Sequence, residues 1–76
     1  MIYNETCDDW LREGDADRAF SACTTQPKEE SEIARELGWT WMRTQLALAA
    51  AYHRGLRHVR VKGGLQFRLA WYRSYL

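Results

Sequence analysis

The C-terminal half of the chain has no acidic residue. All ten Asp and Glu residues lie in residues 1–37, which also carry four bases and therefore have a net charge of −6. Residues 38–76 carry seven bases and a net charge of +7, although the chain as a whole has a charge of only +1. This asymmetry indicates a polyanion or an acidic partner on one side of the molecule, and the alternative is pairing between the two halves.

Other features are also scarce, and each scarcity excludes a class of protein. With only Cys7 and Cys23 there is no disulfide framework, so we expect both thiols to be reduced and Cys23 to lie in the core. No apolar run approaches the roughly 20 residues that a membrane span needs. The acidic start of the chain lacks the basic region of a secretory signal. We therefore expect a soluble, cytoplasmic protein without a membrane partner.

The residues that usually carry catalysis or bind metals form no pattern in this sequence. There is no Ser/His/Asp or Cys/His arrangement, no phosphate-binding glycine loop and no pair of carboxylates on the basic half. His53 and His58 are five residues apart and have no neighbour at a metal-ligand spacing. The sequence therefore predicts a protein that is not an enzyme and that needs neither a metal nor a cofactor.

The N-terminal half has helical spacing with breaks. Apolar residues recur along one face over residues 15–26, which predicts a helix that Asp15 caps and that the break before Pro27 ends. Residues 1–13 form an extension with a short helix of its own, which Gly14 would end. The alternative is one helix that runs through Gly14 at a cost of about 1 kcal/mol.

Two further helices are predicted on either side of a glycine. The first covers residues 29–37, where acids in the first turn suit the helix dipole and Gly38 supplies a left-handed cap. The second covers residues 40–54, with Thr40 as its N-cap, strong helix formers in its middle and Gly55 at its end. A tight turn therefore joins two helices.

After the last helix, the apolar residues alternate as they do in a strand. Val59 and Val61 alternate with polar residues, and Lys62-Gly63-Gly64 supplies a turn, which predicts a β-hairpin over residues 57–71. Residues 72–76 form a tail that extends the strand or packs as an apolar end. The predicted fold class is α+β, with a three-helix core and a C-terminal two-stranded hairpin in a single domain.

This order of elements resembles the winged helix–turn–helix DNA-binding domains. The positioning-helix pattern EIAxxLG corresponds to residues 32–38, the recognition helix to residues 40–54, the strand entry "GL" to Gly55-Leu56, and the wing to residues 57–71. The resemblance covers residues 15–71, and in size the chain is similar to small regulators of phage, plasmid and fimbrial operons.

The resemblance implies a sequence-specific, double-stranded DNA-binding transcriptional regulator of a mobile element or small operon, which acts by occupying an operator. Its recognition helix would enter the major groove and its wing would contact phosphates. A domain this small contacts a short site, so a homodimer or a cooperative assembly on DNA is expected. The residues assigned to DNA are Thr40, Trp41, Arg43, Gln45, Arg57, Arg60, Lys62 and Arg68.

Within this assignment, individual side chains have different expected roles. Arg43 and Gln45 are expected to read guanine and adenine edges. Three of the four cations of the hairpin region are expected on the face opposite Val59, Val61 and Phe67. The helix residues expected to face inward are Thr44, Leu48, Ala51 and Tyr52.

The apolar residues after Gly38 allow a second interpretation. Trp39 is expected in the core, where it seals the turn between two helices. For Trp41 three positions remain open: the core, a contact with a base methyl or sugar, or a protein interface. Met42 is expected to fill a gap. Aromatics and Met are enriched at interface cores, so the alternative function is a winged-helix protein-interaction module, an antirepressor or host-factor inhibitor with an acidic partner.

Overall fold

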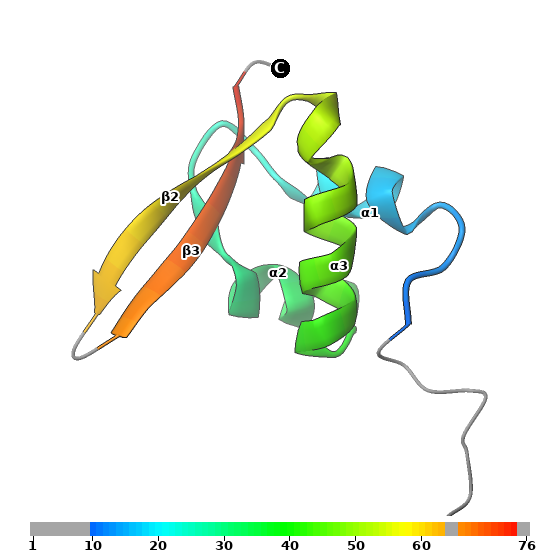
Figure 1. Ribbon diagram of the computed structural model, residues 1–76, viewed down its shortest axis with the longest axis horizontal. Coiled ribbons are helices and arrows are strands. Elements are labelled where there is room, and N and C mark those ends of the chain that lie inside the picture. Colours follow the sequence, from blue (N-terminus) through cyan, green and yellow to red (C-terminus); the bar gives the residue numbers. More distant parts are fainter. Residues whose placement is uncertain (1–9, 64–65, 75–76) are drawn as a thin grey trace, which may run out of the picture.

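The computed structural model describes residues 10–63 and 66–74, which form an α+β fold of three α-helices and one antiparallel sheet. The helices are α1 (Asp15–Ala22), α2 (Glu30–Leu37) and α3 (Trp41–Ala51), and a 3₁₀ turn, Tyr52–Arg54, continues α3. The strands are β1 (Lys28–Glu29), β2 (Leu56–Gly63) and β3 (Gln66–Arg73). The helices pack together on one side, and the β2–β3 hairpin projects away from them (Figure 1).

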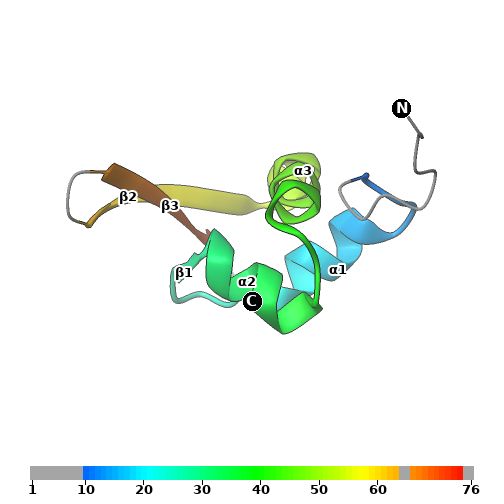
Figure 2. The ribbon, with the colours of Figure 1, turned by 90° about the horizontal axis from the view of Figure 1, so that it is seen from below.

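The sheet has the order β1-β3-β2, so β3 is its central strand. The hairpin register runs from Leu56 opposite Arg73 to Gly63 opposite Gln66, while Lys28 of β1 lies opposite Trp71. Strand β1 has no signal in the sequence, because two residues are too few to show an alternating pattern. Seen from below, the hairpin extends sideways beyond the layer of helices (Figure 2). Much of the hairpin is therefore open to solvent on both faces.

The helix boundaries correct two predictions in the N-terminal half. The N-cap of α1 is Gly14, with a positive φ of 85°, and Asp15 is the first helical residue. The helix ends at Ala22 because Cys23 adopts an extended conformation. Residues 10–14 are not helical, which excludes a continuous helix through Gly14, while the predicted short helix lies largely in residues 1–9, outside the described residues.

The predicted caps of α2 and α3 are confirmed. Gly38 ends α2 with φ 71°, and Gly55 follows the 3₁₀ turn with φ 105°, both in the left-handed region. Thr40 caps α3, since its side chain accepts a hydrogen bond from the backbone N–H of Arg43 at 3.3 Å. The hairpin is also confirmed, although residues 64–65 of its predicted turn and residues 75–76 of the tail lie outside the described residues.

The core joins all three helices to the base of the hairpin. Trp39 packs against this core, as predicted, and so do the partly buried Phe20, Leu37 and Leu69. Tyr52 is 41% exposed, contrary to its predicted inward position, because the tighter 3₁₀ winding begins there and turns the side chain away. The side chain of Phe67 lies outside the described part of the chain. The buried residues of the core are Ala19, Cys23, Ile33, Ala47, Leu48, Ala51, Leu56 and Trp71.

Candidate nucleic-acid interface

The first turn of α3 is fixed by Thr40. Its hydroxyl caps the helix through the N–H of Arg43, and its carbonyl oxygen accepts from both the N–H (3.1 Å) and the hydroxyl (2.8 Å) of Thr44. Thr44 is fully buried, so the side of α3 that it occupies faces the core, as predicted for Thr44, Leu48 and Ala51. The opposite side of α3 faces solvent.

Arg43 turns inward and pairs with Asp15. Its Nε donates to Oδ2 of Asp15 at 2.8 Å, and its Nη2 donates to Oδ1 at 2.9 Å. Its guanidinium carbon also lies 4.2 Å from the centre of the Trp39 ring, a cation–π distance. The side chain of Asp15 is fully buried and that of Arg43 is 11% exposed. Arg43 therefore ties α3 to α1, which differs from its expected role at a base edge.

The carboxylate of Asp15 accepts two further hydrogen bonds. Oδ2 accepts from the backbone N–H of Arg12 at 2.9 Å, and Oδ1 accepts from Nη1 of Arg18 at 3.2 Å. Hydrogen bonding from Arg43 is the largest influence, and it outweighs the effect of burial, so the pKa of Asp15 lies below its ordinary value of 3.8. Asp15 is thus held in its charged form.

This pKa shift predicts that acid weakens the fold through Asp15. Because the folded-state pKa is depressed, the contribution of Asp15 to stability is complete above the unfolded pKa near 3.8 and is lost as the pH falls through the folded value. Urea unfolding at decreasing pH should show a decline in stability that begins near the unfolded pKa. In Asp15→Asn this component of the decline should be missing; an unchanged pH profile in that variant would contradict the assignment.

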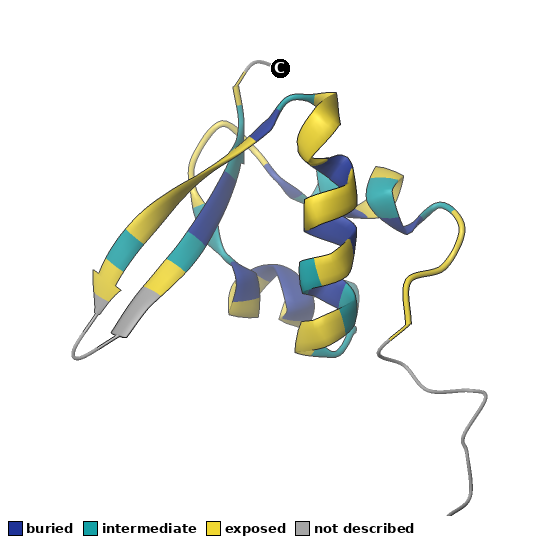
Figure 3. Cartoon of the chain, viewed as in Figure 1, coloured by how far each residue is buried: buried dark blue, intermediate teal, exposed yellow. Residues whose placement is uncertain are grey.

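The solvent side of α3 is apolar. Trp41 is 54% exposed, and Met42 and Leu46 are each 42% exposed. Gln45 is partly exposed between them. The exposed positions run along the side of α3 that faces the viewer in Figure 3. Exposure excludes the core position for Trp41 and the gap-filling role for Met42, while the base contact and the protein interface remain open for Trp41.

A hollow of about 390 Å³ separates the start of α3 from the sheet. Both carboxylates of its wall have a partner: Glu29 forms an ion pair with Nη1 of Arg68 at 3.1 Å, and Oε2 of the buried Glu30 accepts a hydrogen bond from Nε1 of Trp71 at 2.9 Å. The hollow therefore has both apolar and hydrogen-bonding groups. Its lining consists of Glu29, Glu30, Ser31, Trp41, Gln45, Arg68 and Leu69.

The hairpin divides its cations between its two faces. Residues opposite each other in antiparallel strands point to the same face of the sheet, so Arg60 shares a face with Leu69. Lys62 is two residues farther along β2 and therefore lies on that face as well. This face continues at the base of the hairpin into the buried Leu56 and Trp71, and we call it the helix-side face.

The other face, the outer face, carries both valines. Arg57 and Arg68 lie on this face too. Arg57 is two residues before Val59 in the same strand, so both point to the same side, and Arg68 lies opposite Val61. Val59 is 38% exposed. The expectation of three cations on the face opposite the valines is therefore wrong: two lie there and two do not. The even-numbered residues of β2 face the helices, because Leu56 rather than a valine anchors the strand to the core.

The two charged halves of the sequence pair in part. Arg43 pairs with Asp15, Arg54 with Asp17, and Arg68 with Glu29. Within the described residues, pairing between the halves, the alternative raised by the sequence, thus includes these three bases of the C-terminal half.

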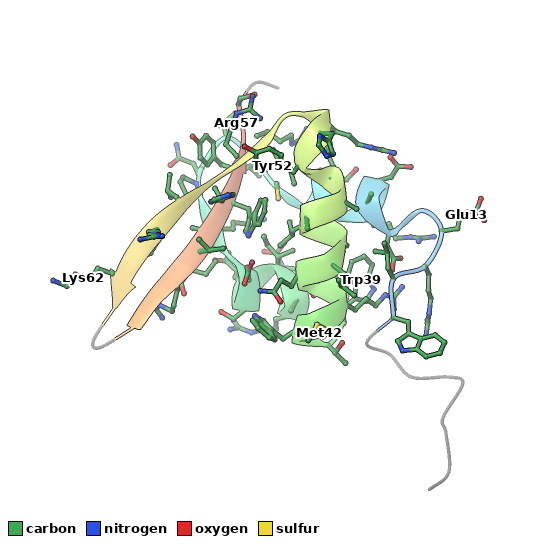
Figure 4. The ribbon with its side chains drawn as sticks, viewed as in Figure 1. Glu13, Trp39, Met42, Tyr52, Arg57 and Lys62 are labelled. Atoms are coloured by element: carbon green, nitrogen blue, oxygen red, sulfur yellow. The ribbon has the colours of Figure 1, made fainter. Side chains whose placement is uncertain are left out.

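The cations of β2 differ in position. Arg57 lies at the base, where its Nη1 donates to the carbonyl of Leu56 at 2.9 Å and its guanidinium lies 5.7 Å from the centre of the Tyr52 ring. Arg60 and Lys62 are exposed farther out. Figure 4 places Lys62 near the tip of the hairpin and Arg57 close to Tyr52 at the other end of β2.

Sequence reasoning missed two residues that organise this region, Glu30 and Trp71. In the sequence, Glu30 is one of several acids at the start of a predicted helix and Trp71 is one residue of a predicted strand. In the structure the two side chains, 41 positions apart in the chain, form a buried hydrogen bond. His58 also stacks against Trp71, with ring centres 4.9 Å apart. A Trp in a strand is a signal for a buried N–H that needs a partner, but it does not say which residue provides it.

In the part of the chain that the structure describes, the remaining reactive groups form no second site. Cys23 is buried, and desolvation raises the pKa of its thiol to about 11. In residues 10–63 and 66–74, no group of three or more His, Cys, Asp or Glu side chains is placed to hold a metal ion. The helices within the same ranges are too short or too polar to cross a bilayer.

Comparison with known proteins gives no relative. No protein-family model matches the chain, and neither a curated protein nor a solved structure shows a significant match.

Proposed function

We propose that the chain is a winged helix–turn–helix protein that binds double-stranded DNA in a sequence-specific manner and regulates transcription of a mobile element or small operon. In this proposal α3 enters the major groove and the β2–β3 hairpin lies along the phosphates beside it. The arrangement of three helices and a small antiparallel sheet is compatible with a winged helix.

One observation carries the proposal: the hairpin face that bears two exposed cations begins, at Leu69, on the hollow that borders the start of α3. Leu69 lines the hollow together with Trp41 and Gln45 of α3. Arg60 lies opposite Leu69 on the helix-side face, and Lys62 follows on that face toward the tip. A helix inserted in the major groove would therefore bring these two cations toward a phosphate strand, which supplies affinity without sequence preference.

The structure changes which of the predicted residues are assigned to DNA contacts in this proposal. Gln45 remains the residue that can form paired hydrogen bonds to an adenine, while Trp41 lies where it can touch a base methyl or sugar. Thr40 serves as a helix cap at the edge of this surface. Arg43 acts inside the protein, and Arg57 lies on the outer face. Arg68 also starts from the outer face, and although it lines the hollow, it is paired there with Glu29. Phosphate contacts are thus assigned to Arg60 and Lys62.

One such domain would cover only a short stretch of an operator. A single helix in the groove reads only a few base pairs, and small DNA-binding domains gain affinity and selectivity by binding as dimers to repeated half-sites. A homodimer or a cooperative assembly on DNA is accordingly part of the proposal.

The direct test is the salt dependence of binding to random-sequence duplexes. Each phosphate contact should contribute about 0.9 to the slope of log K against log salt concentration, so the two assigned cations alone predict a slope near −1.8 or steeper. Fluorescence anisotropy with labelled duplexes at several salt concentrations measures this slope. A slope near zero, or no binding at low salt, would rule out the proposed function.

A second function is favoured by the apolar surface of α3. Trp41, Met42 and Leu46 are the kind of side chains that form the centres of protein interfaces, and the cations nearby suit an acidic partner. We propose, as the alternative, a protein-interaction module that acts as an antirepressor or host-factor inhibitor. Absence of duplex binding at low salt, together with capture of a specific acidic protein that Trp41→Ala abolishes, would favour it.

A further inference from the structure

The side of α3 that the proposed function places in the major groove has no charged side chain. Arg43 is the one charged residue within Trp41–Ala51, and it is held inside the protein by Asp15. The large exposed side chains of this helix are Trp41, Met42 and Leu46, with the amide of Gln45 among them. Three apolar groups and one amide are an unusual set for reading DNA, and they limit which bases α3 can recognise.

The major groove offers few partners to such a set. Guanine presents two hydrogen-bond acceptors, which Arg or Lys usually contacts, and cytosine presents an amino group, which donates to Asp or Glu. The exposed side of α3 has none of these four kinds of side chain. Thymine presents a methyl group at C5, the apolar group of the major groove, and adenine presents the donor and acceptor that suit an amide.

We infer that α3 recognises A·T base pairs, with the C5 methyl groups of thymine packed on Trp41, Met42 and Leu46 and with Gln45 hydrogen-bonded to adenine. The inference rests on the proposed function and names the class of DNA that this surface would select. A C5 methyl group is also found on 5-methylcytosine, and the pairing of Gln45 with adenine is what distinguishes the two sources.

The spacing of the side chains fits this assignment. Residues four apart lie on the same row of a helix, so Trp41 and Gln45 form one row and Met42 and Leu46 form the next. The first row borders the hollow beside Leu69, and the second lies farther out on the helix. Figure 4 shows Met42 at the first turn of α3, at the end of the helix away from Tyr52. An amide next to a row of apolar groups matches an A·T pair, where the adenine edge and the thymine methyl lie side by side.

The experiment uses four synthetic duplexes and the full chain. They are alternating dA·dT, the same duplex with deoxyuridine in place of thymidine, alternating dG·dC, and the same duplex with 5-methylcytosine. We expect dA·dT to bind most tightly and the uracil duplex to bind about fourfold more weakly for each methyl lost from a contact. Methylation of dG·dC should strengthen binding by a smaller factor, because no adenine is present for Gln45.

The matched variant is Met42→Ala with Leu46→Ala, which keeps the wing and the helix propensity of α3. In this variant the preference for thymine over uracil should shrink toward one while binding at low salt remains. Equal binding of the dA·dT and dA·dU duplexes by the unaltered chain would overturn the inference alone. So would a preference that is undiminished in the variant, in which only Trp41 of the three apolar side chains remains. Failure to bind any of the four duplexes at low salt would overturn the proposed function as well.

Discussion

Replacement of Asp15 by alanine is expected to lower the free energy of unfolding by about 3–5 kcal/mol. The carboxylate is fully buried and accepts two hydrogen bonds from Arg43, whose side chain is itself only 11% exposed. Without Asp15, the guanidinium would remain buried against Trp39 with no opposite charge. The expected loss is a large part of the roughly 5–15 kcal/mol that stabilises a typical domain.

Urea unfolding followed by tryptophan fluorescence measures this effect, and two variants make it specific. Asp17→Ala removes an acid two residues away that is 67% exposed and pairs with Arg54 at the surface, so it should change stability by no more than about 0.5 kcal/mol. Asp15→Ala combined with Arg43→Met removes both buried charges and should recover much of the loss. If Asp15→Ala and Asp17→Ala unfold at the same urea concentration, the pair does not hold α1 to α3.

This pair also marks the limit of what the sequence could predict about the site. The position of Arg43 on α3 was inferred correctly, since Thr40 caps the helix and Gly38 fixes the turn before it. Its direction was not, because the side chain is drawn to Asp15, which lies 28 positions away in the chain. The charge imbalance between the two halves indicated that such pairing could occur. It did not say which of the seven bases would take part.

Local signals predicted most of the fold, because they depend on neighbours in the chain. Gly38 and Gly55 end their helices in the left-handed region, and Thr44 and Leu48 face inward at helical spacing. Contacts between residues far apart in the chain could not be predicted from such local signals. The two-residue strand β1 owes its existence to pairing with β3, so no pattern within it could predict its presence.

The hairpin shows how alternation can be recognised and still be assigned to the wrong face. Strict alternation identifies two faces but does not say which one meets the core. The valines indicated one face, whereas the structure anchors β2 through Leu56 and β3 through Trp71 on the other. Because the hairpin extends past the helices, Val59 is left exposed. The face of each cation therefore had to come from the register, and that assignment leads to a test of the interface.

Neutralisation of both helix-side cations, Arg60→Gln with Lys62→Gln, is expected to reduce the salt slope of duplex binding by about 1.8. If the variant and the unaltered chain bind equally at about 1 M salt, this difference in slope makes the variant roughly 60-fold weaker at about 0.1 M salt. Both residues are exposed on β2, so the fold should tolerate the change. The loss should be similar for all sequences, since phosphate contacts carry no base preference.

Arg57→Gln is the matched control, because it removes the same charge from the same strand but from the outer face. Arg57 is held near the base of β2 by the carbonyl of Leu56 and the ring of Tyr52, away from the tip where Lys62 lies. Its replacement should leave the salt slope nearly unchanged, because a cation on the outer face does not meet the phosphates that Arg60 and Lys62 contact. Titrations of one labelled duplex at several salt concentrations compare the variants directly. Equal slopes for Arg57→Gln and Lys62→Gln would show that net charge, rather than the helix-side face of the hairpin, governs binding.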